Sequence, residues 1–193
     1  DTGWQRVDFM QTFTDPIVIA TPLSTNDPDP ALVRIRNIDP SGFDIRLQEW
    51  DYQDGVHDLE TIGVLVLERG SHALPNGTRV EAGRFSTDNT ESFTPVSFAQ
   101  MFAKPPVVLS SVTSFNGSNA VVTRHSGITT SRFELMLQEQ EANTLSHVPE
   151  DIDYVAWEPS SGTIDGLAYE VARTPRSVDL RDFWVDFPLS ALR

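Results

Sequence analysis

An internal duplication constrains this chain more than any other feature, because a repeated sequence implies a repeated structural unit. The two copies open with the same residue types at the same spacing. These residues are Val7, Phe9, Gln11, Phe13 and Pro16 in the first copy, and Val96, Phe98, Gln100, Phe102 and Pro105 in the second. We therefore expect two units of one fold, each at the small end of the domain size range.

Matches continue in the same order to the end of each copy. The later pairs are Phe43–Glu49 with Phe133–Glu139, His57 with His147, Glu60 with Glu150, Ile62–Glu68 with Ile152–Glu158, and Val80–Arg84 with Tyr169–Arg173. The duplication predicts a first module over residues 1–84, a polar linker over 85–95 and a second module over 96–175. Residues 176–193, which include Trp184, are either a closing strand of the second module or the start of a third repeat.

Short segments in which apolar and polar residues alternate indicate β-strands. The run Phe43, Ile45, Leu47 is one example, and Ala31–Arg36 is another, with Arg34 and Arg36 expected on the solvent face. Turn-forming residues separate the segments, and no helical periodicity of useful length occurs. The predicted fold is all-β: two tandem antiparallel β-sandwich modules of about six strands each.

Composition excludes several classes of partner. The 193 residues include 28 acidic and 14 basic side chains, for a net charge of −14, and no basic run that would bind nucleic acid. No apolar stretch is long enough for membrane insertion, and the absence of cysteine excludes disulfides and thiol chemistry. The acidity suits either plain solubility or a saline or calcium-rich exterior. Because Asp1 is not a methionine, we expect a processed or excised piece of a secreted, extracellular protein.

The repeated pattern resembles the H-type lectin domain. The resemblance is carried by Val7, Phe9, Phe13, Pro16, Val33 and Phe43, and again by Val96, Phe98, Phe102, Pro105, Val122 and Phe133. It implies a six-stranded antiparallel β-sandwich, commonly trimeric, that recognises sugars such as N-acetylgalactosamine. Residues 60–83 are also similar to repeats in large bacterial surface and polysaccharide-degrading proteins. The expected partner is thus a glycan or polysaccharide, and the expected assembly is a homo-trimer or further repeats of the same chain.

The lectin family's Trp–His sugar-binding pair has no match here. Position 67 is Leu in the first copy, and its counterpart Trp157 is expected to be a strand residue. Sugar-contacting residues therefore cannot be carried over from the family, and the candidates below come from the chain itself.

One polar constellation occurs in both copies: Glu49, His57 and Glu60, and again Glu139, His147 and Glu150. Glu49 and Glu139 share strand parity with the apolar residues before them, so each carboxylate should be paired or hydrogen-bonded. The group is either a ligand or Ca²⁺ site in each module, or a buried network that fixes the loop before the next strand. Gln11 and Gln100 are expected to be inward-facing amides bonded to backbone.

The copies differ most in the loop after this strand, residues 50–56 against 140–146. The first copy places Trp50 and Tyr52 there, which can stack on sugar rings, and Asp51 and Asp54, which can accept hydroxyl hydrogen bonds. The alternative is that the aromatic residues cover the junction between the modules. No cofactor is expected, although two acidic loops could hold Ca²⁺ instead of being simple turns. They contain Asn26, Asp27 and Asp29, and Asp51, Asp54 and Asp58.

Three functions remain open from sequence alone. The leading hypothesis is a non-catalytic carbohydrate-binding tandem module. The first alternative is a structural or assembly repeat with no small ligand, and the second is a glycan-active enzyme that uses Glu49 or Glu139 with a histidine. Recurrence of the same Glu and His in both small units disfavours catalysis, because fold-determining residues recur in the same way.

Overall fold

The computed structural model describes residues 3–140, 143 and 146–174, and in these residues every regular element is a β-strand. The first copy forms β1 (Gln5–Asp8), β2 (Pro16–Ala20), β3 (Ala31–Asp39), β4 (Gly42–Glu49), β5 (Val64–Glu68), β6 (Gly70–Ala73) and β7 (Arg79–Thr87). The second forms β8 (Thr94–Ser97), β9 (Val107–Val112), β10 (Val121–Ser126), β11 (Arg132–Glu139), β12 (Glu150–Trp157), β13 (Ser160–Ile164) and β14 (Leu167–Val171). All strand pairs are antiparallel, which confirms the predicted all-β sandwich class.

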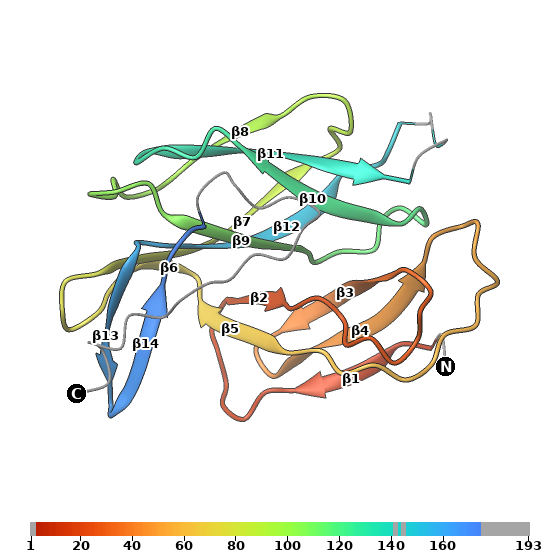
Figure 1. Cartoon of the computed structure of the whole chain (residues 1–193), viewed down its shortest axis with the longest axis horizontal. Helices are drawn as coiled ribbons and strands as arrows, with labels where there is room; N and C mark the ends of the chain where they lie inside the picture. The colour runs from red at the N-terminus through yellow and green to blue at the C-terminus, as the bar shows by residue number, and fades with distance from the viewer. Residues whose placement is uncertain (1–2, 141–142, 144–145, 175–193) are drawn as a thin grey trace.

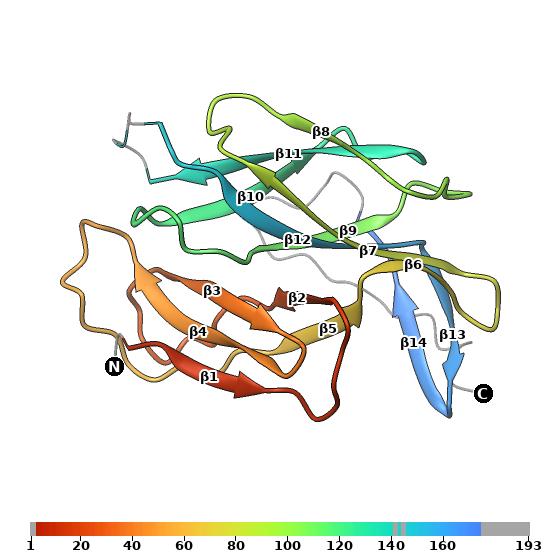
Figure 2. The same ribbon diagram turned by 180° about the vertical axis from the view of Figure 1, so that it is seen from behind.

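The sheets stack in layers (Figures 1 and 2). In the first unit, sheet β1-β4-β3 faces the two-stranded sheet β2-β5. In the second unit, sheet β10-β11-β8 faces sheet β6-β7-β12-β9. The inner sheets of the two units lie against each other, so the molecule is a stack of two sandwiches.

Alternating apolar side chains from facing sheets form the core of each sandwich. Phe43, Ile35 and Val18 are fully buried in the first unit, and Phe133 and Leu135 are fully buried in the second. The alternation read in the sequence therefore places the same face of β4 and β11 inward. Phe133 also packs against Phe85, a residue from the last strand of the first copy.

Strand β7 leaves the first unit and joins the second. It pairs with β12 along its length, from Val80 opposite Trp157 to Thr87 opposite Glu150, and β12 pairs on its other side with β9. The domain limits expected from the repeat therefore need correction: β6 and β7, within residues 70–87, belong to the second sandwich by their pairing. Of the expected linker 85–95, residues 85–87 end β7, residues 94 and 95 begin β8, and residues 88–93 connect them.

A third apolar cluster joins the two sandwiches. Ile17 and Ile19 of β2 pack against Val80, Ala82 and Val155 of the second sheet. Beside this cluster, the buried Asp153 carboxylate accepts hydrogen bonds from the Val18 N–H at 2.7 Å and the Arg84 Nε at 2.6 Å. Burial raises the pKa of Asp153 although Arg84 opposes the shift. The interface thus has the packing and the satisfied polar groups of a domain interior.

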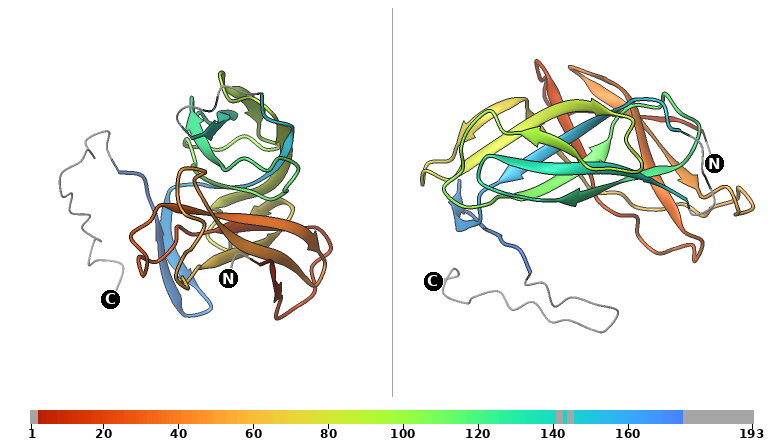
Figure 3. Two further views of the ribbon diagram at one scale, coloured as in Figure 1. Left: turned by 90° about the vertical axis from the view of Figure 1, so that its right-hand side faces the viewer. Right: turned by 90° about the horizontal axis from the view of Figure 1, so that it is seen from above.

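The hairpin β13–β14 projects from the second sandwich beside the layers of the first (Figures 1 and 3). Its two-residue turn is formed by Asp165 and Gly166, which both have positive φ angles, as tight hairpins require. The segment in which a closing strand or a third repeat was expected, residues 176–193, lies outside the described residues.

Candidate functional site

A pocket with a volume of about 430 Å³ opens on the first unit, where β4 ends and the following loop turns back. Its lining includes six of the residues predicted as site or network residues: Glu49, Trp50, Asp51, Asp54, His57 and Glu60. Tyr52 is absent from that lining and is 69% exposed. The remaining predicted residues, Glu139, His147 and Glu150, belong to the second unit.

Glu49, His57 and Glu60 form a connected group in the lining of the pocket. The Glu49 Oε1 lies 3.1 Å from the His57 Nδ1, and the Glu60 Oε1 lies 3.6 Å from the His57 Nε2. Glu49 also accepts the Gly55 N–H at 2.8 Å, which fixes the loop above it. The carboxylate of Glu49 is therefore paired, as its strand parity predicts.

Glu60 organises the loop between β2 and β3. It accepts the Ser24 hydroxyl and the N–H groups of Asn26 and Asp27, both at 2.9 Å. The Ser24 hydrogen bond is the main reason that the pKa of Glu60 lies below its usual value. A carboxylate with so many donors holds a loop and stays ionised.

In the second unit the equivalent residues are buried more deeply. Glu150 is fully buried and accepts the Ser114 hydroxyl and the N–H groups of Asn116 at 3.0 Å and Gly117 at 2.9 Å. His147 is buried beneath this loop, and a Cβ on Gly117 would lie only 2.4 Å from its ring. Glu139 lies 3.9 Å from the His147 Nε2. In this unit the constellation fits the network interpretation better than the ligand interpretation.

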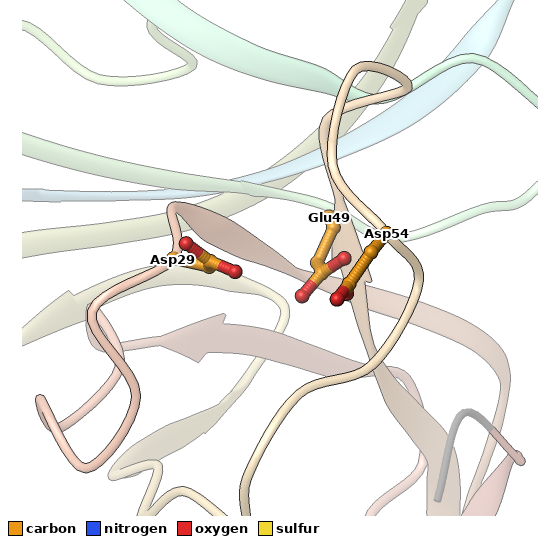
Figure 4. Close-up of side chains that lie close together, drawn as sticks. All are labelled: Asp29, Glu49 and Asp54. Atoms are coloured by element: carbon orange, nitrogen blue, oxygen red, sulfur yellow. The ribbon is translucent and has the colours of Figure 1, made fainter.

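Three carboxylates converge beside the first pocket, and two of them, Glu49 and Asp54, line it (Figure 4). Asp29, Glu49 and Asp54 each place an oxygen within 4.8 Å of the others. The two acidic loops singled out in the sequence therefore meet, although only one residue of each contributes with Glu49. Carboxylate oxygens of this kind could hold a hard cation such as Ca²⁺.

The Trp50 loop also contacts the second unit. Asp51 and Gln140 exchange two hydrogen bonds, at 2.8 Å from the Asp51 N–H and 2.7 Å from the Gln140 amide. The Gln48 side chain donates to the Ser118 carbonyl at 2.7 Å. Asp51 is thereby engaged at the junction between units, whereas Trp50 and Asp54 face the pocket.

Sequence reasoning missed Arg34, which was expected on the solvent face and is fully buried instead. The loop before β10 covers this face of β3. Arg34 donates to the Glu150 carboxylate at 3.0 Å and the Asn119 carbonyl at 2.8 Å, and its guanidinium lies 4.7 Å from the centre of the Phe115 ring. Trp4 packs edge-on against Phe115. Within the single strand, Arg34 looks like any exposed arginine, and only the second unit makes it interior.

Stability should depend on pH through His125 in the second unit. Its Nε2 lies 2.7 Å from the Ser110 hydroxyl, its ring packs on Phe133, and burial lowers its pKa to about 4. The unfolded chain, with a histidine pKa of about 6.5, takes up a proton first as the pH falls. The stability contribution of neutral His125 is complete above about pH 6.5 and is lost toward pH 4, about 3 kcal/mol in all.

Urea denaturation at pH 7 and at pH 5 measures this effect. The His125→Gln variant should lose part of the stability difference between the two pH values. An identical difference in the variant and the parent chain would show that His125 does not titrate as described.

Comparison with known proteins returns one informative similarity. The chain is 26% identical over 189 residues to Halomucin of Haloquadratum walsbyi. The aligned region covers 92% of this chain and 2% of Halomucin. The chain thus spans a very small part of that protein's length. No protein-family model matches the chain, and no solved structure matches it. The similarity to Halomucin fits an extracellular protein.

The residues that the structure describes contain no helix of the length and hydrophobicity needed to cross a lipid bilayer.

Proposed function

We propose that this chain is a non-catalytic, carbohydrate-binding tandem module of a secreted protein, and that its first unit binds sugar in the Trp50 pocket. One observation carries the proposal. The loop in which the two repeats differ forms the wall of the pocket, and it places an indole beside carboxylate acceptors. Indole rings stack on the apolar faces of sugars, and carboxylates accept their hydroxyl hydrogen bonds.

The surroundings of Glu60 favour binding over catalysis. Glycoside hydrolysis needs a carboxyl group with a raised pKa as the general acid. Hydrogen bonds from Ser24 and the loop amides lower the pKa of Glu60 instead. Glu49, the other glutamate of the pocket, is hydrogen-bonded to His57 and the Gly55 N–H, so its oxygens serve the loop.

Replacing Trp50 with alanine should weaken glycan binding by roughly tenfold or more, since the stacking surface is lost. N-acetylgalactosamine, the sugar implied by the lectin resemblance, is the first probe, and a glycan array extends the search. Titration calorimetry with the best glycan, with calcium and with a chelator, measures the affinity. Calcium dependence would point to Asp29, Glu49 and Asp54.

Tyr52→Ala is the matched control, because Tyr52 lies in the same loop, is 69% exposed and does not line the pocket. It should retain the parent affinity. Equal losses in the two variants, or no loss in Trp50→Ala, would contradict a sugar site in this pocket.

A structural or assembly role is the second candidate. It is favoured by β7, a strand from the first repeat that completes the sheet of the second sandwich. A strand shared by neighbouring repeats builds a continuous array without any ligand. A ligand that binds the folded state raises the melting temperature by mass action. If no glycan that binds on the array raises the melting temperature, the structural role is preferred.

A further inference from the structure

The inner sheet of the first unit lacks a strand that the second unit has. In the second unit, β12 lies between β7 and β9. Residues 62–68 repeat residues 152–158, so β5 is the counterpart of β12 in the first unit. Among the strands that the structure describes, β5 has β2 as its one hydrogen-bonded neighbour. No strand of the described residues therefore pairs with the edge of β5 that corresponds to the β7 side of β12, and we call this the open edge.

Hydrogen bonding to β2 shows which backbone groups lie at this edge. The Gly63 carbonyl accepts the Thr21 N–H at 2.8 Å, and the Arg69 N–H donates to the Asp15 carbonyl at 2.9 Å. Backbone groups alternate sides along a strand, so Val64 and Val66 direct theirs to the open edge. In β12 the corresponding groups are paired with β7, and Tyr154 is 6% exposed where Val64 is 44% exposed.

Strand β7 makes a second contact in the second unit, and the equivalent residues of the first unit have no such partner among the described residues. The buried Glu81 of β7 accepts the N–H groups of Ala99 at 3.0 Å and Gln100 at 3.1 Å. The Gln100 side chain donates to the Val80 carbonyl at 2.9 Å.

The equivalent residues in the first unit are Met10 and Gln11. Both are exposed, and neither makes a hydrogen bond to any part of the chain that the structure describes. The expectation that Gln11 bonds to backbone is therefore wrong for this single copy. A strand paired with the open edge of β5 would supply these acceptors, as β7 does in the second unit.

Strand β14 repeats the chemistry of β7 and has an unused edge. Tyr169, Glu170 and Val171 repeat Val80, Glu81 and Ala82. Within the described chain β14 pairs with β13 only, its Glu170 is half-buried where Glu81 is 2% exposed, and residues 172–174 are exposed. Figure 3 shows this hairpin extending from the second sandwich.

We propose that β14 of one copy of this chain adds to the open edge of β5 in a second copy. The register of β7 on β12 sets Glu170 opposite Val66 and Ala172 opposite Val64, by analogy with Glu81 opposite Ala156 and Gly83 opposite Tyr154. Glu170 then accepts the N–H groups of Met10 and Gln11. This is strand addition, in which main-chain hydrogen bonds supply affinity and side-chain contacts supply specificity.

The proposed contact joins different surfaces of the two copies, so it is heterologous and builds an open array unless the rotation between copies closes a ring. It also covers a strand edge that would otherwise invite nonspecific pairing. The charge of −14 makes copies repel one another. Association should therefore be measured at about 1 M salt, where the Debye length is about 3 Å.

A cysteine cross-link tests the register, because the chain has no cysteine of its own. The Val64→Cys chain is mixed, under mild oxidation, with an Ala172→Cys chain that carries a mass tag. Hydrogen-bonded antiparallel partners lie about 5.5 Å apart between Cα atoms, within disulfide range. We expect a disulfide-linked heterodimer on a non-reducing gel.

A tagged Leu167→Cys chain is the matched control, because Leu167 is exposed on the same strand but about 16 Å from position 172 at 3.3 Å per residue. Its heterodimer yield should be roughly tenfold lower. Equal yields for the two tagged chains, or no heterodimer with either, would overturn the proposal.

Sedimentation of the unmodified chain provides an independent readout. We expect an average mass that grows with concentration. For Glu170→Lys, the affinity of association should be roughly tenfold lower. Denaturation of the same variant verifies that its fold is intact. A monomer mass at all concentrations, or growth unaffected by Glu170→Lys, would reject head-to-tail strand addition, whatever the outcome of the glycan experiments.

Discussion

Replacing Arg34 with alanine should lower the free energy of unfolding by about 3–5 kcal/mol, among the largest effects of any single substitution in this chain. Arg34 and Glu150 are both fully buried and come from different units, with 3.0 Å between their charged atoms. Removing the arginine leaves the Glu150 carboxylate without its counter-charge and leaves the Gly117 and Asn119 carbonyls without a donor. Urea denaturation followed by tryptophan fluorescence measures the loss.

Two further variants separate the ion pair from simple loss of volume. Arg124→Ala, an exposed arginine on β10, should change stability by about 0.5 kcal/mol or less. The double variant Arg34→Met with Glu150→Gln should be less destabilised than Arg34→Ala, since no unpaired charge is buried. If Arg34→Ala costs less than about 1 kcal/mol, the guanidinium is hydrated and the interface is looser than described.

Phe133→Ala should also cost about 3–5 kcal/mol, because it removes a fully buried ring from the centre of the second core. Its ring contacts Phe85, Phe98 and Tyr154, so collapse of the surrounding core cannot fill the space easily. Calorimetry or denaturant unfolding gives the loss.

Phe43→Ala, the counterpart in the first core, tests whether the units unfold together. Because β7 comes from the first repeat, pairs in the second sandwich and packs against β2, each phenylalanine variant should shift one common transition. Leu59→Ala is the control, since Leu59 is 75% exposed. Two separate transitions, with each variant moving only its own, would show that the units are independent despite the shared strand.

Part of the candidate site was readable from the sequence. Glu49 shares strand parity with Leu47, and an inward carboxylate needs a partner, so local periodicity predicted that Glu49 is paired, and the structure supplies His57. The approach of Asp29 to Asp54 did not follow. Those residues lie in different loops, and the distance between loops depends on how β3, β4 and the chain after β4 are arranged in space.

The sequence misled us about Arg34, whose surroundings come from the other unit. Alternation put Arg34 on the face of β3 opposite the core, which is correct, but that face is covered by the loop that carries Phe115. Periodicity reports on one strand at a time, whereas burial depends on every segment that packs there.

The sequence by itself determined the all-β class, the two repeated units and the inward faces of β4 and β11, because these depend on local periodicity and turn chemistry. Only the tertiary structure decided that β7 pairs with β12 and not with β5. Strands β5 and β12 are counterparts in the two copies, and each offers an edge of backbone N–H and C=O groups. These groups are the same in every residue type except proline, so the sequence does not distinguish the two edges. The packing of Phe85 against Phe133 and Tyr154 in the second core favours the β12 edge. That choice leaves the β5 edge open.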